Sequence, residues 1–462
     1  MLTIGIYVRI MVMHKHTFGS RDRSEFVLDN IFMIDYSNEP RRNIMCIDVK
    51  SFFASVEAVE RGQNPMKARI AVVSKPDAKG GLVLASSPLV KREYGVKTGT
   101  RIYEIPKNAN IEIVEPRMAL YLERNLDILR IFKRYVADED LLVYSIDESF
   151  LDVTKSHRLF GSTIEIAKKI QNDAWKELSL VLTIGIGDNP LLAKLALDNQ
   201  AKNDDKNYFI GEWRYEDVPQ TVWKIEALND FWGIGSKTEI NLNRLGIKNI
   251  YELSQFDLSK LKNKFGVIGE QIFFHSHGID RTVLSDTYTP KSTSFSRNQI
   301  LNRDYIFRHE VVIVIREMAD ENITRLRKNG LLTGVVRLSI EYSRDISNKG
   351  FSRQMKIDPT DSSKKLKEYM LHLFDKYYEK LPVRVVNVTF AKLQSKQASQ
   401  LSFFESVEET IHNEELDKTI DFIRRKYGYT SLLHASSLMD GGMAKYRDTL
   451  LGGHRSGKGD GK

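Results

Sequence analysis

The chain has 462 residues, of which 42% are hydrophobic, so it is long enough for about three or four domains with cores of their own. Its 69 basic and 61 acidic residues give a net charge of +8, and the region 291–395 alone holds 20 Lys and Arg against 12 Asp and Glu. One region therefore carries the whole positive excess, which is typical of a domain that binds a polyanion and excludes an evenly charged chain.

Cysteine content and the first residues bear on the compartment. The single cysteine, Cys46, excludes an intramolecular disulfide framework and, with no Cys-x-x-Cys pair, argues against a structural zinc. The apolar run 4–13 is interrupted by Arg9 and is too short to span a bilayer. We therefore expect a cytoplasmic protein with no secretion signal and no membrane anchor.

The first elements expected along the chain surround an acidic residue. Apolar and β-branched residues make 44–47 a short buried strand that leads to Asp48, and a helix is expected over 52–61. Farther along, the run 141–146 is a second expected strand, and it leads to Asp147-Glu148. Because both strands are expected to be buried, their carboxylates should be aimed rather than randomly solvated.

Three carboxylates that converge from two strands suit Mg2+, which prefers oxygen ligands and leaves positions for water and substrate phosphates. Two such ions about 3.5 to 4 Å apart can clamp the attacking and leaving oxygens of an in-line displacement. The pattern therefore predicts a phosphoryl-transfer site. For any one acid alone, a strand end or a hairpin turn is the alternative interpretation.

Strands and helices alternate around these acids. Apolar residues at helical spacing predict a long helix over 117–135, with six residues facing the core: Leu120, Leu122, Leu126, Leu129, Ile131 and Phe132. The other expected elements are strands at 70–73, 82–85 and 181–186 and helices at 162–178 and 191–202. This order predicts a mixed layer of strands and helices.

From 209 to 283 the pattern becomes mainly helical. Residues 231–237, followed by 242–250, read as a helix-hairpin-helix in which Gly233 and Gly235 free the backbone. A glycine turn that opens a helix exposes NH groups to a phosphate oxygen, so Ser236 and Lys237 become candidate contacts with a nucleic-acid backbone. A plain helix-helix turn is the alternative.

After a polar linker at 282–291, six elements are expected in the order βαββαβ: strand 293–300, helix 306–328, strands 331–342 and 350–357, helix 362–379 and strand 383–393. The alternation along these strands predicts one face on the core and one face that presents Arg and Lys to a duplex. Arg297, Arg337 and Arg353 are the candidates on that face, and a merely solvated basic face is the alternative.

The residues around the two acidic segments resemble the two signature motifs of Y-family translesion DNA polymerases. These are Asp48-Val49-Lys50-Ser51-Phe52-Phe53-Ala54-Ser55-Val56-Glu57 and Ser145-Ile146-Asp147-Glu148-Ser149-Phe150-Leu151-Asp152. Matching segments also lie at 85–87, 92–99, 183–187, 189–194 and 201–202. The resemblance covers roughly residues 41–405 and is strongest to the UmuC and UvrX-like bacterial branch, the impB/mucB/samB family.

The resemblance implies a multidomain α+β fold, a right-hand polymerase with a ferredoxin-like palm, small fingers, a helical thumb and a βαββαβ little finger. The expected segments are a leader 1–40, palm 41–52 and 118–208, fingers 53–117, thumb 209–283, linker 284–292, little finger 293–395 and tail 396–462. Residues 1–32 precede the resemblance, and Met33 stands where a typical member begins. We therefore expect this leader to be dispensable for polymerase activity.

Carried over by position, the resemblance makes Asp48, Asp147 and Glu148 catalytic ligands of two Mg2+ ions, with the carbonyl of Val49 as a further ligand. Phe53 is then the steric gate, a flat ring that would collide with the 2'-hydroxyl of a ribonucleotide. An ordinary core aromatic is the alternative for Phe53.

The incoming triphosphate needs cationic and hydroxyl partners, and the matching positions are Ser86, Arg92 and Lys202, with Phe52 beside the nucleotide or in the core. A solvated lysine at a helix end is the alternative for Lys202. Many relatives carry a tyrosine where this chain has Leu89, a departure that bears on nucleotide affinity.

The segment Gln400-Leu401-Ser402-Phe403-Phe404 resembles the short peptide by which bacterial polymerases bind the sliding clamp, the β subunit of DNA polymerase III. Glutamine at a pocket rim and apolar anchors in a cleft are the expected contacts. Packing of this segment on its own domain is the alternative. A charged helix is expected at 405–427, and the glycine-rich end, 452–462, is expected to be disordered.

The resemblance thus implies an error-prone DNA polymerase that extends a primer on damaged primer-template DNA with deoxynucleoside triphosphates. A recombinase filament or an accessory subunit is a candidate activator. Two alternatives from other classes are a palm-fold nucleotide cyclase, which would release a cyclic nucleotide without a template, and a non-catalytic DNA- and clamp-binding scaffold, which would bind without metal-dependent synthesis.

Overall fold

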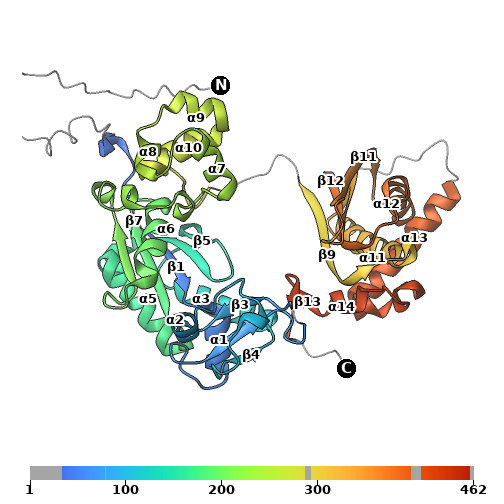
Figure 1. The fold of residues 1–462 in the computed structure, drawn as a ribbon, viewed down its shortest axis with the longest axis horizontal. Helices are drawn as coiled ribbons and strands as arrows, with labels where there is room; N and C mark the ends of the chain where they lie inside the picture. The colour runs from blue at the N-terminus through green and yellow to red at the C-terminus, as the bar shows by residue number, and fades with distance from the viewer. Residues whose placement is uncertain (1–33, 79, 287–292, 397–406, 458–462) are drawn as a thin grey trace, which may run out of the picture. The chain divides into compact units, whose positions relative to one another are not determined.

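A computed structural model of the chain describes residues 34–78, 80–286, 293–396 and 407–457 (Figure 1). The chain divides into two compact units. The first comprises Met1–Asp48, Phe150–Ala167 and Thr183–Val283, and the second comprises Val49–Ser149, Lys168–Leu182 and Leu284–Lys462. Residues 1–33 of the expected leader and the 400–404 peptide lie outside the described residues.

A five-stranded sheet carries both acidic segments. Its strand order is β5-β6-β1-β7-β8, and β7 pairs with β8 in parallel. The strands are β1 Ile44–Val49, β5 Leu141–Val143, β6 Glu148–Asp152, β7 Leu182–Gly187 and β8 Ile210–Trp213. The strand predicted over 141–146 is too long. It ends at Val143 because the amides of Tyr144 and Ser145 both donate to the carbonyl of Glu148, which folds 144–147 into a turn.

Two glycines of β7 allow a helix to lie directly on the strand. A Cβ at Gly185 would stand 2.1 Å from the carbonyl oxygen of Ala193, and one at Gly187 would stand 2.5 Å from the Ala193 amide nitrogen. Both positions therefore require glycine. The helix is α6, Pro190–Asn199, which ends before the predicted 202, so Lys202 lies in the following 3-10 turn, Ala201–Asn203.

The small region after β1 is a three-stranded sheet with short helices. The strand order is β3-β2-β4, with β2 antiparallel to β3 and parallel to β4. The elements are α1 Phe52–Glu60, β2 Ile70–Val73, β3 Val83–Ser86, α2 Pro88–Tyr94 and β4 Glu112–Val114. The predicted strand 82–85 is thus displaced by one residue, and the predicted helix and strand at 52–61 and 70–73 are confirmed.

The long helix α3, Met118–Phe132, was predicted with the wrong buried face. Leu122 and Leu126 are 42% and 55% exposed, whereas Tyr121, Asn125 and Ile128 are buried. The buried set repeats at helical spacing and includes two polar residues because each has a hydrogen-bond partner: Tyr121 on Glu57 and Asn125 on the carbonyl of Ile146. A count of apolar residues misses a helix face of this kind.

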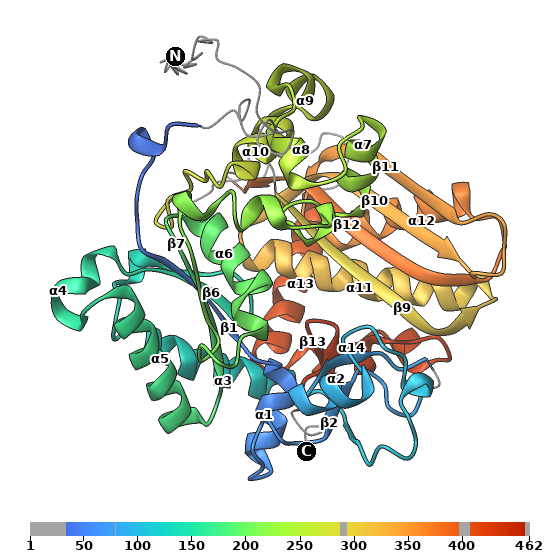
Figure 2. The ribbon, with the colours of Figure 1, turned by 60° about the vertical axis from the view of Figure 1, so that its left-hand side comes forward.

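The first unit also contains the short helix α4, His157–Phe160. The longer helix α5, Thr163–Leu178, begins in the first unit and ends in the second. The region 209–283, which is the expected thumb, is mainly helical as predicted: α7 Ser236–Arg244, α8 Ile250–Ser254, α9 Leu258–Phe265 and α10 Val267–Ser276 (Figure 2). Its core includes Trp223, Phe231 and Leu242 and continues onto Leu192 of α6.

The predicted βαββαβ order after the linker is confirmed. The elements are β9 Ser294–Tyr305, α11 Arg308–Lys328, β10 Leu331–Tyr342, β11 Gly350–Thr360, α12 Ser363–Tyr377 and β12 Val383–Ser395. The sheet is antiparallel with the order β11-β10-β12-β9. Both helices pack on one face of it (Figure 1), and residues such as Ile315, Phe374 and Val388 form a single core.

The tail packs on this domain. Helix α13, Val407–Tyr427, confirms the predicted charged helix, and α14, Ala444–Asp448, follows. Arg447, which is 7% exposed, pairs with Glu317 and Glu321 of α11, and Arg424 pairs with Asp320 of the same helix. Ion pairs that are shielded from solvent fix the tail on α11 because an unpaired charge there would be costly.

The prediction that 452–462 is disordered is wrong for the part that the structure describes. Residues Leu450–Leu451 and His454–Arg455 form a two-stranded hairpin, β13 and β14. The two residues between them, Gly452 and Gly453, have φ of +61° and +87°. A two-residue loop with both φ values positive has the twist that antiparallel strands need, and glycine supplies it without strain. Within 34–457, as far as the structure describes it, no helix is long and apolar enough to cross a membrane.

The thumb core contains a buried histidine, His277, which makes its stability depend on pH. The ring lies against Trp223 and Phe273, and Nε2 is 3.0 Å from the carbonyl of Ser254. Burial lowers the pKa of His277 to about 4, although the contact with Ser254 acts in the opposite direction.

We predict that the thumb loses stability as the pH falls from about 6.5 to about 4. In this window the unfolded state binds a proton on His277 that the folded state does not. The neutral ring therefore contributes about 3 kcal/mol to the free energy of unfolding above pH 6.5, and this contribution is lost as the pH falls toward 4. Urea denaturation at several pH values should show this slope. It should shrink in His277→Gln and persist in His309→Gln, whose ring is exposed; an unchanged slope in His277→Gln would contradict the assignment.

Candidate active site and nucleic-acid interface

The turn from β1 into α1 places Asp48 and the aromatic pair Phe52-Phe53 within six residues. Ser51 adopts a left-handed backbone, φ 53° and ψ 47°, which turns the chain sharply out of the strand. The hydroxyl of Ser55 donates to the carbonyl of Lys50 at 2.6 Å and fastens the first turn of the helix. The strand end carrying Asp48 is therefore held against the start of the helix.

The second acidic segment is hydrogen-bonded to the first through the backbone. The amide of Val49, the residue after Asp48, donates to the carbonyl of Asp147 at 3.0 Å. The hydroxyl of Ser145 donates to Oδ1 of Asp147 at 2.8 Å, and Glu148 begins β6 with only 8% of its surface exposed. The two motifs that the sequence separates by about a hundred positions thus meet at adjacent residues.

Lys202 is joined to Asp48 by an ion pair. Its Nζ lies 3.3 Å from Oδ2 of Asp48 and 2.8 Å from Oδ1 of Asp198. Burial alone would lower the pKa of Lys202, but Asp48 and Asp198 outweigh it and hold the pKa above its usual value. The ammonium group stays charged, and its ion pairs with Asp48 and Asp198 give it fixed partners that a fully solvated lysine lacks.

The oxygen atoms of the expected metal ligands are of the kind that a hard divalent cation prefers. They are carboxylate oxygens from Asp48, Asp147 and Glu148 and the nearby carbonyl oxygen of Val49, which suit Mg2+. No group of three or more His, Cys, Asp or Glu residues with the geometry of a metal site occurs among the residues that the structure describes. The metal assignment therefore stays a proposal, supported by the chemistry of these residues.

The two phenylalanines after β1 divide into a core residue and a surface residue. Phe52 is 2% exposed, whereas the half-buried Phe53 stacks on Tyr121 of α3, with ring centroids 4.4 Å apart and planes 14° apart. Phe53 therefore has one face supported and part of its surface accessible. A sugar-excluding ring needs both properties.

The two remaining nucleotide candidates, Ser86 and Arg92, lie in different surroundings. Ser86 is fully buried, and its hydroxyl already donates to the carbonyl of Val96 at 2.5 Å. Arg92 is exposed on α2, one turn after the half-buried Leu89. Arg92 thus has a side chain available to a phosphate, while the burial of Ser86 favours a structural role for its hydroxyl.

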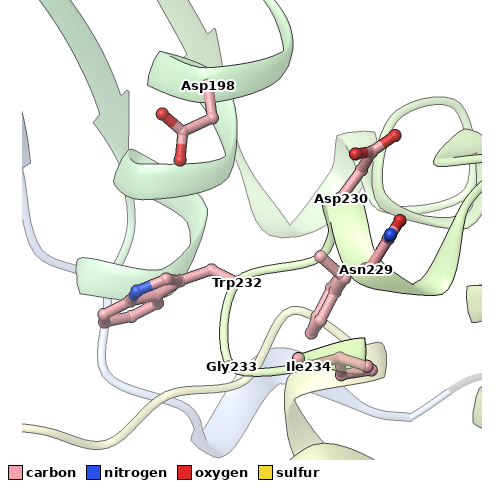
Figure 3. Close-up of a pocket in the computed structure, with 8 residues that line it drawn as sticks. Asp198, Asn229, Asp230, Trp232, Gly233 and Ile234 are labelled. Atoms are coloured by element: carbon pink, nitrogen blue, oxygen red, sulfur yellow. The ribbon is translucent and has the colours of Figure 1, made fainter. Parts of the chain in front are cut away.

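The glycine turn of the thumb opens α7. Gly233 has φ of +97°, and Gly235 is the N-cap residue of a helix that begins at Ser236. Gly233, Gly235, Ser236 and Lys237 are all exposed. A shallow pocket of about 460 Å3 lies along this turn, and Figure 3 shows Asp198, Asp230 and Trp232 around it. The carboxylates of Asp198 and Asp230 would repel a phosphate from the pocket. The expected phosphate contact is therefore the start of α7, from Gly235 to Lys237.

The predicted basic face of the little finger must be corrected. Arg353 pairs in register with Leu338, and Arg297 with Val388; both partners are fully buried, so these two arginines lie on the helix-covered side of the sheet. There Arg297 pairs with Glu321 of α11, and Arg353 lies over the ring of Tyr377 of α12.

Only Arg337 of the three candidate arginines lies on the open face. It receives support from Gln354, whose Oε1 accepts a hydrogen bond from Arg337 Nη2 at 2.6 Å. The register places uncharged polar residues beside it: Ser296, Asn298, Ser339, Ser352, Asn387 and Thr389. The open face is therefore polar with few charges rather than basic.

The sequence analysis did not predict a buried cluster of hydrogen-bonded side chains around Glu57, which contacts the ring pair and the acidic turn through helix α3. Buried Glu57 of α1 accepts hydrogen bonds from Arg61, Arg117 and Tyr121. Asn125, one turn after Tyr121, donates to the carbonyl of Ile146 at 2.7 Å. The signal available in the sequence was Glu57 itself, an acid at an otherwise apolar helix face.

Comparison with known proteins agrees with this architecture. The family model described as impB/mucB/samB family matches residues 47–198, its C-terminal domain model matches 291–403, and the model described as DNA polymerase-iota, thumb domain, matches 229–280. Among solved structures, the Y-family DNA polymerase chimera Dbh-Dpo4(243-245)-Dbh is similar with a TM-score of 0.59 and 22% identity, over 76% of this chain and 99% of that chain. The fold is thus that of a multidomain α+β right-hand polymerase.

Two relatives from Bacillus subtilis (strain 168) cover nearly the whole chain. "Putative UV-damage repair protein UvrX" is 42% identical over 92% of this chain and 100% of its own length. "DNA polymerase IV 2" is 34% identical over 89% of this chain and 98% of its own length. The chain belongs to the impB/mucB/samB family, in the UmuC and UvrX-like branch of the Y-family DNA polymerases.

We predict that the thumb turn needs Gly233 for its backbone and not for space. No atom lies within 4 Å of a Cβ placed at either Gly233 or Gly235, but only Gly233 has a positive φ. Gly233→Ala should cost about 1 to 2 kcal/mol of stability and weaken primer-template binding, because an L-residue is strained there.

Gly235→Ser is the matched control. It adds a larger side chain at φ −90°, at a helix N-cap that favours serine, so stability should not fall. Urea denaturation and DNA binding of both variants check the prediction, and equal stability of Gly233→Ala and the wild-type chain would refute it.

Proposed function

We propose that the chain is a template-directed, error-prone translesion DNA polymerase that extends a primer with deoxynucleoside triphosphates by two-metal phosphoryl transfer. The observation that carries the proposal is the meeting of the two motifs, in which the Val49 amide donates to the carbonyl of Asp147. The fold class and the family of the relatives support the same reaction. DNA repair after ultraviolet damage is the setting suggested by the name of one relative.

In the proposed site Asp48, Asp147, Glu148 and the Val49 carbonyl would hold two Mg2+ ions. Bound there, such ions would lower the pKa of the primer 3'-hydroxyl and neutralise charge on the transferring phosphate. The protein supplies position: the Val49 to Asp147 hydrogen bond sets the two strands, and Ser145 orients the Asp147 carboxylate. Lys202, which is held charged, adds a cation for the triphosphate beside Asp48.

Substrate choice in this proposal rests on Phe53 and Arg92. The half-exposed ring of Phe53 would lie under the sugar and exclude a 2'-hydroxyl by collision. The exposed guanidinium of Arg92 can bind phosphate oxygens in a bidentate manner. Leu89 leaves the tyrosine contact of many relatives unmade, so more of the triphosphate binding falls to Arg92 and Lys202.

Primer-template DNA would contact the thumb turn and the little finger. Amides at Gly235 to Lys237 suit a phosphate, and the open face around Arg337 offers hydroxyl and amide groups for the backbone. Residues 400–404 would bind the sliding clamp, and the cytoplasm is the proposed compartment. A nucleotide cyclase would not require the thumb turn, the little finger or the clamp-binding peptide. A non-catalytic scaffold would not require the paired acids or the stacked ring of Phe53.

We predict that Asp147→Ala/Glu148→Ala abolishes synthesis. Loss of both carboxylates should lower primer extension with Mg2+ by about a thousandfold or more, because bound metal contributes several kcal/mol to the barrier. Glu139→Ala/Asp140→Ala, a neighbouring acid pair, should keep wild-type activity. The assay is gel-based primer extension on undamaged and abasic templates.

Extension by the intact chain that is lost only in the 147/148 variant would support the polymerase and its acids, and bypass of the abasic site would support the translesion role. If the intact chain binds primer-template and does not extend it even with the clamp supplied, the scaffold function is favoured. Cyclic nucleotide formed without template would favour the cyclase.

We predict that Leu401→Ala/Phe403→Ala spares distributive synthesis and removes stimulation by the clamp. The two side chains are the proposed apolar anchors, and truncation of such anchors commonly costs about 2 kcal/mol or more each. Ser399→Ala, just outside the peptide, should behave as wild type. Clamp binding measured by surface plasmon resonance checks the result, and equal affinity of both variants would refute the peptide.

A further inference from the structure

The ring of Tyr121 forms a floor under Phe53. Tyr121 is fully buried, and its ring is nearly parallel to that of Phe53, with a centroid distance of 4.4 Å and an angle of 14°. Phe52 contacts the same ring at a tilt, with centroids 6.3 Å apart. A stacked aromatic pair of this kind is attractive and directional, so the position of the Tyr121 ring determines the position of the Phe53 ring.

Tyr121 is itself fixed by a buried carboxylate. Its hydroxyl donates to Oε1 of Glu57 at 2.8 Å, and the side chain of Glu57 has no exposed surface. Arg117 donates to both oxygens of Glu57, at 3.0 Å from Nε and 2.7 Å from Nη2, and Arg61 donates to Oε2. Glu57 is therefore held by two arginines, and it fixes the hydroxyl of Tyr121 through one charge-assisted hydrogen bond.

The charge states of this cluster are consistent with a rigid support. Burial alone would raise the pKa of Glu57, but hydrogen bonds from Arg117, Tyr121 and Arg61 outweigh it and lower the pKa. Burial raises the pKa of Tyr121 well above its usual value. At neutral pH Glu57 is thus an anion and Tyr121 a neutral donor, so the bond between them persists.

One face of α3 connects the gate support to the catalytic turn. Tyr121 and Asn125 lie four residues apart and share the buried face of the helix. Asn125 Nδ2 donates at 2.7 Å to the carbonyl of Ile146, the residue before Asp147. A shift of this helix would therefore move the gate ring and the acid turn together.

We propose that Tyr121 is a positioning residue for sugar discrimination, which holds the ring of Phe53 at the height that excludes a ribonucleotide. The proposal rests on the proposed polymerase function. A steric gate works by collision, so a support that yields would let the ring of Phe53 move away from the sugar and admit the 2'-hydroxyl. Tyr121 itself touches neither sugar nor phosphate in this scheme.

The test measures kcat/KM for a deoxyribonucleotide and for the matching ribonucleotide on one undamaged primer-template. Tyr121→Leu, which removes the floor, should lower the deoxy-to-ribo ratio about tenfold, a change equivalent to about 1.4 kcal/mol. Most of the change should be a lower KM for the ribonucleotide. Tyr121→Phe keeps the ring and loses the bond to Glu57, so the ratio should fall about threefold.

Tyr135→Leu and Tyr135→Phe are the matched controls. Tyr135 lies just beyond the end of the same helix, is 8% exposed, and donates its hydroxyl to Asp173 at 2.8 Å. Its replacement removes the same chemical groups at comparable burial, away from Phe53. The control variants should lower thermal stability but leave the ratio at the wild-type value.

Phe53→Leu is the benchmark that separates failures. A wild-type chain that incorporates no nucleotide overturns the proposed function, and the inference falls with it. A ratio unchanged in Phe53→Leu overturns the gate, and the inference again falls. A ratio that drops in Phe53→Leu and stays at the wild-type value in Tyr121→Leu overturns the inference alone. If Tyr121→Leu does not fold, Tyr121→Phe decides: a ratio equal to that of the wild type overturns the inference, and a lower ratio supports it.

Discussion

The rest of the site depends on the left-handed turn at Ser51. A non-glycine residue with φ of 53° costs about 1 kcal/mol, and the cost is offset by the hydrogen bond from Ser55 to the carbonyl of Lys50. The turn lets helix α1 begin at Phe52, three residues after the end of strand β1 at Val49. Without it, α1 could not continue directly from the buried strand, and Asp48 and Phe53 would diverge.

The order of elements could be predicted because it is local. Strand and helix periodicity predicted the βαββαβ domain with errors of a few residues. Phe52 is 2% exposed and Phe53 is half-buried, whereas their expected roles stay predictions. A shared site for the two acidic segments was predicted, but the hydrogen bond that joins Val49 to Asp147 was not. Nothing local in the sequence states which strands of a sheet are neighbours.

Where prediction failed, the deciding contact was distant or polar. The buried face of α3 is set by Glu57, so Tyr121 and Asn125 displace the leucines from the core side. Arg297 and Arg353 lie on the helix-covered face of the two outer strands, where a long side chain can keep its charged end beside Glu321 or over the ring of Tyr377. The glycine-rich end was judged by composition, although adjacent glycines between short apolar and basic pairs also suit a hairpin loop.

The carboxylates of Glu57 and Asp147 differ in the number and charge of their hydrogen-bond donors, which suits them to different roles. Glu57 accepts four hydrogen bonds, from Arg61, Tyr121 and twice from Arg117, which leaves little capacity for a ligand. Asp147 accepts one from the hydroxyl of Ser145, a neutral donor that orients the group and does not neutralise it. A carboxylate saturated with donors is a fixed point of the structure, whereas one oriented by a single hydroxyl keeps lone pairs for a cation. Helix α3 contacts both sites. Its Tyr121 donates a hydrogen bond to Glu57, and its Asn125 donates one to the carbonyl of Ile146 in the turn that carries Asp147.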